Sequence, residues 1–343
     1  MASDPPAKMK AIQYNKPLDF DVVKISVPEP EANEVLVRAH FADGYFPSAM
    51  PLVTGHEMSG EVAKIGKSVK GLSIGDKVTA DSLVSCGCCN ACRRGRSLYC
   101  DNIRARGMHS TYLKPLLPCP IRASTEKVDG GFAEYCVFPA SKLTPIPSLS
   151  WTQATLIEAA ACAIHGLDRI KPAYGSSVLL LGAGPTGLCL SQLFRAGGCV
   201  KVVLAANAGT KLDLARQDPE PDWKSLQDAH PAGFDIVIEA TGDIEVLRRS
   251  IDYCAKGGTL GLYGVYPPAE TLTISPFLVF FKELSIIASC SQLNCVPRAV
   301  DYIKSGRLRV DGIVTHTFSL EEYGEAIRSV QEKKCVKAAI LID

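Results

Sequence analysis

Two groups of potential metal ligands stand out in the first hundred residues of this 343-residue chain. In the first group, His56 and Glu57 are adjacent and follow Gly55, whose backbone freedom allows a turn that directs both side chains toward one point. An imidazole together with a carboxylate suits a zinc ion. Such a pair alone is more often structural or solvated than bound to a metal, so the rest of the chain must decide between the interpretations.

The second group consists of cysteines within residues 86–100. Their tight spacing is typical of a closed tetrahedral zinc site, and short gaps limit the entropy lost on closing the loop. Unligated thiols at this density would be prone to oxidation. We therefore predict a structural zinc lobe, with Cys88 as a spare thiol out of register. The predicted ligands are Cys86, Cys89, Cys92 and Cys100.

Composition narrows the class of protein. Hydrophobic residues make up 47% and charged residues 21%, and the 37 basic residues nearly balance the 36 acidic ones, so neither nucleic acid nor an anionic membrane is an expected partner. The longest apolar candidate, residues 275–287, is interrupted by Lys282 and Glu283 and is too short to cross a bilayer. Fourteen cysteines behind an N-terminus unlike a signal peptide predict reduced thiols and a cytoplasmic location.

Short β-like runs with frequent turns precede the cysteines and predict a small barrel-like β domain. The His56-Glu57 turn lies between two of these runs. Residues 107–129 show no helical or strand period, which predicts a long loop or insertion. The expected strands are residues 10–13, 22–27, 34–40, 61–65 and 77–80.

From Trp151 onward, the pattern of hydrophobic residues changes from short β-like runs to longer helical periods. Residues 153–165 predict an amphipathic helix that contains Glu158 within a small, apolar run. A charge at such a position needs a partner or solvent. Two interpretations remain: Glu158 faces water, or it faces the metal.

A dinucleotide-binding fold is predicted next, because the apolar strand 177–181 runs directly into a glycine-rich turn and a helix over 188–196. The turn lets a pyrophosphate approach the helix N-terminus, where free N–H groups favour anions. Strands 234–239 and 258–264, with a helix over 244–255, extend this into a doubly wound parallel sheet. The predicted cofactor-binding residues of the turn are Gly182, Gly184, Pro185, Thr186 and Gly187.

The strand 201–205 bears on the choice of nucleotide. NAD-selective folds usually place Asp or Glu at its end to bind the ribose hydroxyls, and neither residue is present here. Asn207, Thr210 and Lys211 could instead bind a 2′-phosphate. The sequence therefore leaves both NAD and NADP open and favours acceptance of NADP.

These parts together resemble the zinc-containing medium-chain dehydrogenase/reductase superfamily, most closely its polyol branch of sorbitol, xylitol and arabinitol dehydrogenases. The resemblance covers almost the whole chain. It is carried by Gly55-His56-Glu57-x-x-Gly60-x5-Gly66-x-x-Val69, by the cysteine lobe, by the turn 182–187 and by Leu156-Ile157-Glu158.

The resemblance implies an α/β protein with a GroES-like catalytic domain over 1–150, a Rossmann NAD(P)-binding domain over 151–289 and a return to the catalytic domain over 290–343. His56, Glu57 and Glu158 would hold a catalytic zinc, with Glu158 as a direct or water-mediated ligand. The substrate would be an alcohol or polyol, and the chain would form a homodimer or homotetramer.

The sequence also departs from the family pattern. A cysteine ligand is expected between the strand 35–40 and Gly55, but this stretch contains none, and His40 or Asp43 could take its place. Further differences are an apparent deletion near Gln217 and an apparent insertion over 108–125. Near the C-terminus Ser291-Gln292-Leu293-Asn294 replaces an Arg-Tyr pair of animal sorbitol dehydrogenases, which fits fungal-type arabinitol relatives better.

Three functions therefore remain open. The first is a zinc-dependent alcohol or polyol dehydrogenase. The second is a catalytically impaired relative that retains the structural zinc and the nucleotide fold. The third is a zinc-independent enone or quinone reductase of the same superfamily, which would have little use for Gly-His-Glu together with Glu158.

Overall fold

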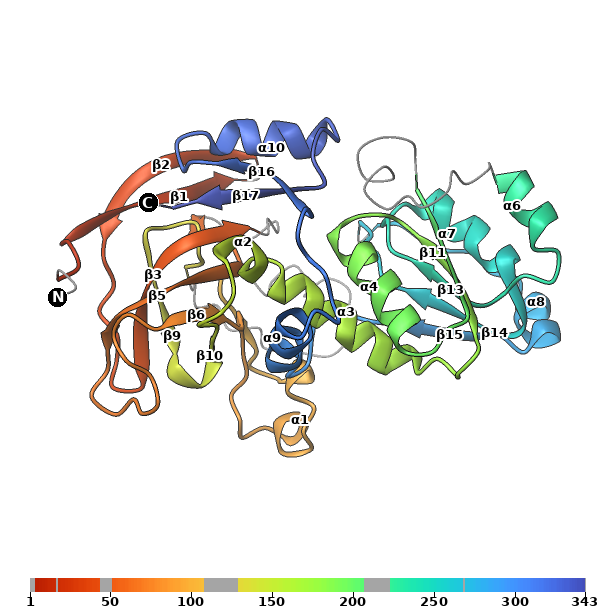
Figure 1. The fold of residues 1–343 in the computed structure, drawn as a ribbon, viewed down its shortest axis with the longest axis horizontal. Helices are drawn as coiled ribbons and strands as arrows, with labels where there is room; N and C mark the ends of the chain where they lie inside the picture. Colours follow the sequence, from red (N-terminus) through yellow and green to blue (C-terminus); the bar gives the residue numbers. More distant parts are fainter. Residues whose placement is uncertain are drawn as a thin grey trace. The chain divides into compact units, whose positions relative to one another are not determined.

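The computed structural model describes residues 4–16, 18–43, 51–107, 129–206, 223–267 and 269–342. The chain divides into two compact units. The first comprises residues 1–158, 314–332 and 338–343, and the second comprises residues 159–313 and 333–337. Each unit is built on its own β-structure (Figure 1).

The limits of these units differ from the predicted divisions at residues 150 and 289. Helix α9 (Val296–Lys304), predicted to return to the first domain, belongs to the second unit. Within the second unit, α9 buries Val296, Ala299, Val300 and Ile303, and its Arg298 guanidinium donates to the Asp168 carboxylate with one N–O distance of 3.1 Å. The chain returns to the first unit only at Val314.

The first unit, where the sequence predicted a small barrel-like β domain, is mainly antiparallel β-structure. One sheet has the strand order β2-β1-β4, and a larger one has the order β10-β6-β5-β3-β17-β16 with β9 also paired to β3. The small pair β7-β8 precedes and follows the cysteine segment. The strands are β1 Lys8–Lys16, β2 Asp19–Ser26, β3 Glu34–Asp43, β4 Leu52–Val53, β5 Glu57–Ile65, β6 Lys77–Ala80, β7 Leu83–Val84, β8 Arg104–Ala105, β9 Tyr135–Pro139, β10 Leu143–Pro145, β16 Val314–Phe318 and β17 Lys337–Leu341.

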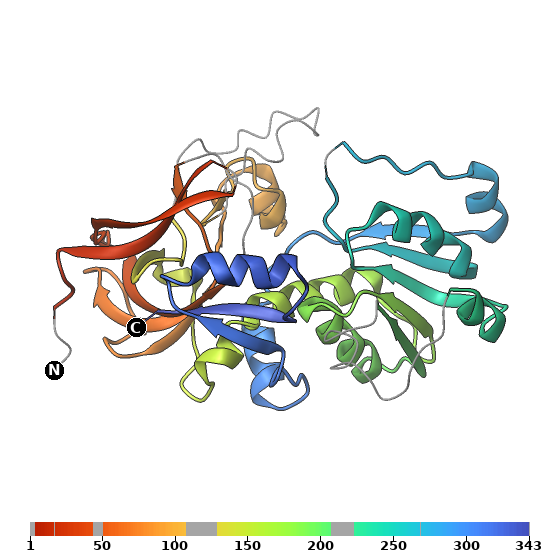
Figure 2. The same cartoon turned by 90° about the horizontal axis from the view of Figure 1, so that it is seen from above.

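Aromatic side chains join the two ends of the chain in this unit. The buried hydroxyls of Tyr14 and Tyr323 lie 2.9 Å apart, and the ring centroid of Phe132 lies 5.0 Å from that of Tyr323. Helix α10 (Tyr323–Gln331) carries Tyr323 and packs against β16 (Figure 2). The buried aromatic area therefore fixes the returning C-terminal segment onto the N-terminal strands.

The helix predicted over 153–165 is two helices, α2 (Trp151–Ala154) and α3 (Ile157–Ile170). A capping box starts α2: the Ser150 hydroxyl accepts from the Gln153 amide at 3.2 Å, and the Gln153 side-chain oxygen accepts from the Ser150 amide at 3.0 Å. The break after α2 places Glu158 in the first turn of α3. The other helices of the unit are α1 Asn90–Arg93 and the short 3-10 turns η1 Ser97–Tyr99 and η3 Ala140–Lys142.

The second unit contains the predicted doubly wound sheet. Its five described strands are all parallel and have the order β12-β11-β13-β14-β15. The predicted helix over 244–255 ends earlier, at Ser250, and a 3-10 turn leads into β14. The elements are β11 Ser177–Leu181, α4 Pro185–Ala196, β12 Lys201–Ala205, α6 Trp223–Ala229, β13 Phe234–Glu239, α7 Ile244–Ser250, η4 Ile251–Tyr253, β14 Cys254–Leu262, α8 Pro276–Lys282 and β15 Ser285–Ala288.

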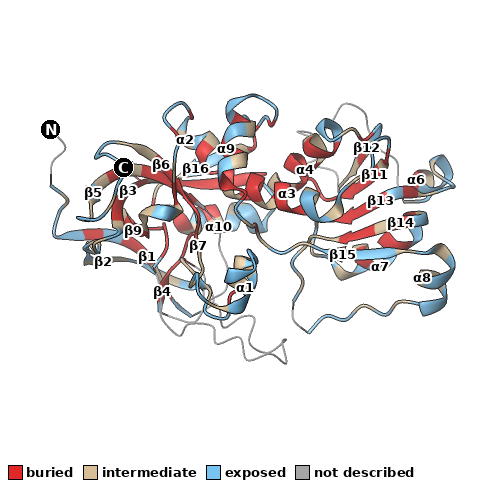
Figure 3. Cartoon of the chain, turned by 90° about the horizontal axis from the view of Figure 1, so that it is seen from below, coloured by how far each residue is buried: buried red, intermediate tan, exposed pale blue. Residues whose placement is uncertain are grey.

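Strand order determines where this sheet can bind a ligand. The chain moves from β11 outward to β12 in one direction and from β13 to β14 in the other, so right-handed crossovers place α4 and α7 on opposite faces. The strands between them are buried on both sides (Figure 3), with Leu179, Val237 and Leu260 fully enclosed. The reversal lies between β11 and β13, and ligands of such sheets bind at the carboxyl ends of the strands beside it.

Candidate functional site

His56, Glu57 and Glu158 come together in the first unit. One ligand atom from each side chain lies within 4.8 Å of those of the other two, and all three residues are half-buried. His56 precedes β5, Glu57 is the first residue of β5, and Glu158 is in the first turn of α3. One imidazole and two carboxylates at this separation can surround a divalent ion.

Gly55 shapes the turn that presents the first two side chains. Its φ of +97° lies in the region that favours glycine, and an added Cβ would come within 2.9 Å of the Phe132 backbone nitrogen. The Gly131 amide donates to the Gly55 carbonyl at 2.8 Å. A side chain at this position would push the turn away from residues 131–132, and His56 would move with it.

Buried polar atoms around the turn support the interpretation as a ligand site. In the described part of the chain, His56 Nδ1 has no hydrogen-bond partner although it is buried, and the same holds for the hydroxyls of Thr54 and Ser59. An unsatisfied buried polar group costs free energy. A cation held by His56 would offset part of that cost, so the residues present fit a metal ion.

His40 does not belong to this group of donors. Its ring stacks on Trp151, with a centroid separation of 4.6 Å and an interplanar angle of 12°, and Lys77 lies over the same indole ring at 4.6 Å. Among the described residues, His40 therefore does not replace the missing cysteine ligand. The Asp43 side chain lies outside the described part of the structure.

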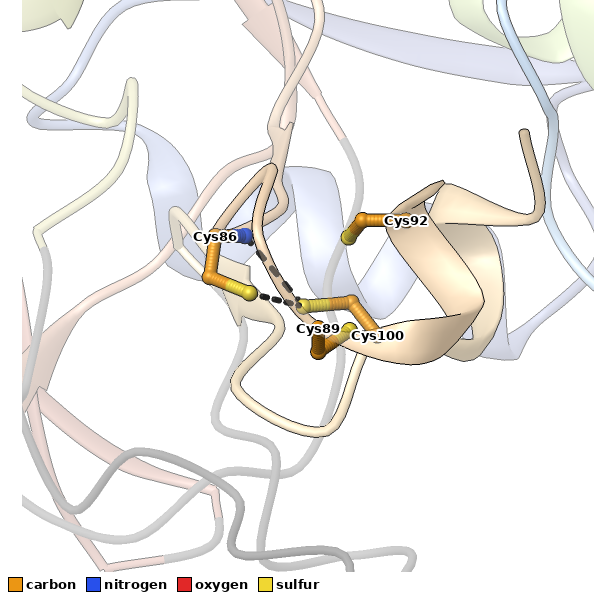
Figure 4. A group of neighbouring side chains, drawn as sticks. All are labelled: Cys86, Cys89, Cys92 and Cys100. Carbon is orange, nitrogen blue, oxygen red and sulfur yellow. Dashed lines mark hydrogen bonds between the residues drawn. The ribbon is translucent and has the colours of Figure 1, made fainter. Parts of the chain in front are cut away.

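The four predicted lobe cysteines converge on one point (Figure 4). One sulfur from each of Cys86, Cys89, Cys92 and Cys100 lies within 4.8 Å of the others, and the Cys86 and Cys100 sulfurs are 3.4 Å apart. Helix α1 carries Cys92, and Cys100 directly follows η1. Four thiolates in a compact cluster form the donor set of a structural zinc site.

Backbone amides point at the sulfur atoms of this lobe. The amides of Cys86 and Asn102 donate to the Cys100 sulfur at 3.2 and 3.3 Å. Backbone hydrogen bonds from Cys88 and Cys89, together with the Cys100 thiol, lower the pKa of Cys86 to about 6. Burial raises the pKa of Cys100 to about 12. Proton sharing explains the contrast: the Cys100 thiol donates to a Cys86 thiolate, and a divalent ion can replace that shared proton.

Cys88, predicted to be a spare thiol, is not one of the four converging cysteines. It is exposed, and its thiol lies 3.7 Å from the Cys86 sulfur. The described group of potential ligands does not include it.

The glycine turn of the second unit has the geometry of a nucleotide-binding loop. Gly182 has a φ of +117° and its amide donates to Ala205 at 2.8 Å. A Cβ on Gly187 would lie 2.1 Å from the Gly182 carbonyl oxygen, so this position permits the helix to approach the strand closely. A Cβ on Gly184 would meet nothing within 4 Å, which leaves space for a ligand.

Helix α4 begins directly at this turn. Gly184 is its N-cap and Pro185 its first residue, and Thr186 is half-buried beside the free amides of the first turn. The sequence predicts that an anion binds here, and the first turn of α4 offers the free amides that such binding would use. Asn207, Thr210 and Lys211 lie outside the described residues.

One residue escaped the reasoning from sequence. Glu239 ends β13 next to the glycine turn and is completely buried. Its sequence signal is an acidic residue at the end of a mostly apolar strand, and the same strand carries a second acid, Asp235, that is exposed. The structure shows several donors on its carboxylate, including the Thr241 amide at 2.6 Å.

Comparison with known proteins places both units in one family. Residues 23–148 match the alcohol dehydrogenase GroES-like domain, and residues 185–305 match the zinc-binding dehydrogenase family. D-arabinitol dehydrogenase 1 of Uromyces fabae is 40% identical in an alignment 358 positions long, which covers 98% of this chain and 97% of the relative. Sorbitol dehydrogenase of Bacillus subtilis is 26% identical over 98% of this chain and 98% of its own length.

Comparison with solved structures supports the same family. A zinc-binding dehydrogenase from Sinorhizobium meliloti 1021, bound to NADP, has a TM-score of 0.86 and 30% identity over 98% of this chain and 100% of that one. The chain therefore belongs to the zinc-containing medium-chain dehydrogenase/reductase superfamily, in its polyol dehydrogenase-like branch. It is an oxidoreductase of the alcohol and polyol dehydrogenase class, with the predicted GroES-like and Rossmann folds.

No helix in the described ranges combines the length and the apolar character that crossing a membrane requires.

Proposed function

We propose that the protein is a zinc-dependent dehydrogenase that transfers a hydride from a secondary alcohol of a polyol to NAD(P)⁺. The observation that carries this proposal is the convergence of His56, Glu57 and Glu158, in a chain whose other unit carries the glycine turn 182–187. D-arabinitol is the substrate to test first, because the relative at 40% identity is a D-arabinitol dehydrogenase.

His56, Glu57 and Glu158 would hold the catalytic ion. The two carboxylates would balance the two charges of a zinc ion. When bound, zinc supplies a Lewis acid that lowers the pKa of a substrate hydroxyl and so favours departure of the hydride. The half-buried position of the three side chains limits the water that competes with substrate for the ion.

The cysteine lobe would hold a second, structural zinc. Its four ligands lie within one segment that has little regular structure, so the ion would supply much of the energy that orders it. Retention of this ion does not require the catalytic site, and the two sites can be tested separately.

The nucleotide would bind at Gly182, Gly184, Pro185, Thr186 and Gly187, with its pyrophosphate at the N-terminus of α4. We propose that NADP is accepted at least as well as NAD. The proposal is supported by the lack of an acidic residue at the end of β12, by Asn207 and Lys211 in the following sequence, and by the relative solved with NADP.

A second copy of the chain is the expected partner, in a homodimer or homotetramer. Helix α8 exposes Phe277, Phe280 and Phe281, and Phe280 is 80% exposed. Strand β15 is the last strand of the described sheet and its residues are mostly exposed. An exposed strand edge next to an apolar helix can pair with its own copy across a two-fold axis.

Metal analysis combined with turnover tests the function. We expect two zinc ions per chain and formation of NADH or NADPH from D-arabinitol, xylitol or sorbitol, and loss of turnover after a chelator removes the ion at His56. One zinc without turnover of any alcohol would instead identify a catalytically impaired relative. NADPH-dependent reduction of an enone or quinone that survives removal of that ion would identify a zinc-independent reductase.

A further inference from the structure

Glu239 is a fully buried carboxylate whose surroundings consist of neutral donors. The amides of Thr241 and Gly242 donate to it at 2.6 and 3.2 Å, and the hydroxyls of Thr241 and Tyr266 donate as well. Burying a carboxylate is costly unless hydrogen bonds replace its water shell. Four donors on two oxygens meet that requirement.

These hydrogen bonds join two loops at the carboxyl edge of the sheet. Thr241 and Gly242 follow β13, whereas Tyr266 follows β14. The backbone strengthens the link, because the amides of Tyr263 and Gly264 both donate to the Glu239 carbonyl at 2.9 Å. The two loops also pack closely against each other and against the carboxylate. A Cβ on Gly264 would lie 2.3 Å from the Gly242 nitrogen and 2.6 Å from Glu239 Oε2. Movement of the carboxylate would therefore shift both loops.

The loop after β13 directly adjoins the glycine turn. The Ala240 amide donates to the Leu181 carbonyl at 2.8 Å, and a Cβ on Gly182 would lie 3.0 Å from the Ala240 carbonyl carbon and 3.2 Å from Thr241 Cγ2. Gly182 follows β11 and Ala240 follows β13, the two strands at which the sheet reverses its direction of progression. Residues 240–242 therefore form a wall of the position where a dinucleotide binds in such folds.

We propose that Glu239 is a positioning residue for the nicotinamide cofactor, holding the loops at Thr241-Gly242 and Tyr266 against the glycine turn. This inference rests on the proposed NAD(P)-dependent function. Glu239 itself does not contact the nucleotide, because its oxygens are already occupied by protein donors. Its effect is on the shape of the binding site before the nucleotide arrives.

Glu239→Gln tests the inference. An amide keeps the volume but offers one acceptor oxygen and an NH₂ group that would face protein donors, so at least one hydrogen bond is lost. Loss of a hydrogen bond to a charged group corresponds to about a 10- to 100-fold weaker Kd for NADPH or NADH if the loops lose their position. Fluorescence titration of the full chain measures the Kd, and Glu245→Gln on the exposed side of α7 is the matched control.

Two further readouts separate positioning from general destabilisation. We expect the KM for the cofactor to rise while kcat stays within about threefold, because Glu239 is not at the reacting atoms. We also expect faster hydrogen exchange of the Thr241 and Gly242 amides in the cofactor-free variant. Tyr266→Phe removes one donor and should weaken binding less, and the double variant should resemble Glu239→Gln alone because the two side chains act through one contact.

An unchanged Kd in Glu239→Gln, with slow exchange at Thr241 and Gly242, would overturn the inference while leaving the proposed function intact. If Glu239→Gln fails to fold, Tyr266→Phe decides alone, and an unchanged Kd in that variant overturns the inference. A wild-type chain that binds neither nucleotide would overturn both the inference and the proposed function.

Discussion

A ring nitrogen of His56 and a carboxylate oxygen of Glu158 lie within 4.8 Å of each other, although one residue precedes a β-strand and the other begins a helix far along the chain. The relationship depends on the break between α2 and α3, which places Glu158 in the first turn of the second helix. A continuous helix over the whole segment would rotate that carboxylate to another direction.

Replacement of Glu158 by Gln should remove the catalytic ion and leave the lobe ion in place. The amide cannot supply the negative charge that balances the cation, so we expect the zinc content to fall from two to one per chain and kcat/KM to fall by at least about 100-fold. Elemental analysis and steady-state kinetics measure both. Glu29→Gln, an acid paired with Lys64 on the surface, is the matched control and should retain two ions. Two ions in Glu158→Gln would contradict the assignment of this ligand.

In the cysteine lobe, we expect substitution of a ligand to remove the structural zinc ion. Cys100 is buried and central to the cluster, whereas Cys88 is exposed and outside the group of donors. Cys100→Ser should therefore lose the lobe zinc and lower the melting temperature, because the ion orders the segment. Cys88→Ser should keep the zinc content and the melting temperature of the wild type. Equal zinc loss in both variants would mean that Cys88 is a ligand.

The separation of the ligand residues along the sequence determined how much of these sites could be predicted. The cysteines of the lobe are separated by few residues, so their cluster could be read from the sequence before the fold was known. His56 and Glu57 were found for the same reason. Glu158 needed the resemblance as well, since its apolar surroundings alone left solvent and metal as equal alternatives.

Tertiary contacts explain what the sequence did not reveal. The donors on Glu239 come from Thr241, Gly242 and Tyr266, and only the pairing of β13 with β14 brings Tyr266 to that carboxylate. Likewise, α9 was predicted to return to the first domain, because its own amphipathic pattern does not say which unit it covers. Its contact through Arg298 to Asp168 of α3 depends on the folded arrangement.

Two alanine substitutions in the glycine turn should have separable effects. Gly184→Ala meets no protein atom within 4 Å, so the free protein should keep its melting temperature while the Kd for NADPH rises, because the methyl group enters the space left for the ligand. Gly187→Ala would place Cβ 2.1 Å from the Gly182 oxygen and should cost about 1–3 kcal/mol of stability. Thermal melting and cofactor titration distinguish them. Unaltered cofactor affinity in Gly184→Ala would exclude this turn as the pyrophosphate site.

Asp235 should make the stability of the second unit depend on acidic pH. The Ser177 amide and hydroxyl donate to its carboxylate at 2.7 and 2.8 Å and lower the pKa of Asp235 below its ordinary value of 3.8. A depressed folded pKa stabilises the protein above the unfolded pKa, and this contribution is lost as the pH falls through the folded pKa.

Asp235→Asn should therefore lower stability at pH 7 by roughly 1 kcal/mol, a value reduced by the exposure of the pair. The difference from wild type should shrink as the pH falls below about 3.8. Denaturant unfolding at several pH values measures it, with exposed Asp228→Asn on α6 as the control. A stability difference that does not change between pH 7 and the acid range would show that the Asp235 charge is not responsible.

The apolar face of α8 should control assembly. Phe277 and Phe281 stack with ring centroids 5.6 Å apart, and Phe280 is exposed on the same helix, close in sequence to the exposed strand β15. Burying one such phenylalanine side chain between two copies contributes about 1.5–3 kcal/mol, so Phe280→Asp should weaken self-association by at least about 10-fold.

Sedimentation should show a multiple of the 36.8 kDa chain mass for wild type and a shift toward the single-chain mass for the variant. Tyr174→Asp, at an exposed aromatic outside α8, should leave the mass unchanged. A wild-type chain that remains monomeric at micromolar concentration, or a Phe280→Asp variant with the wild-type mass and affinity, would show that this face is not the interface.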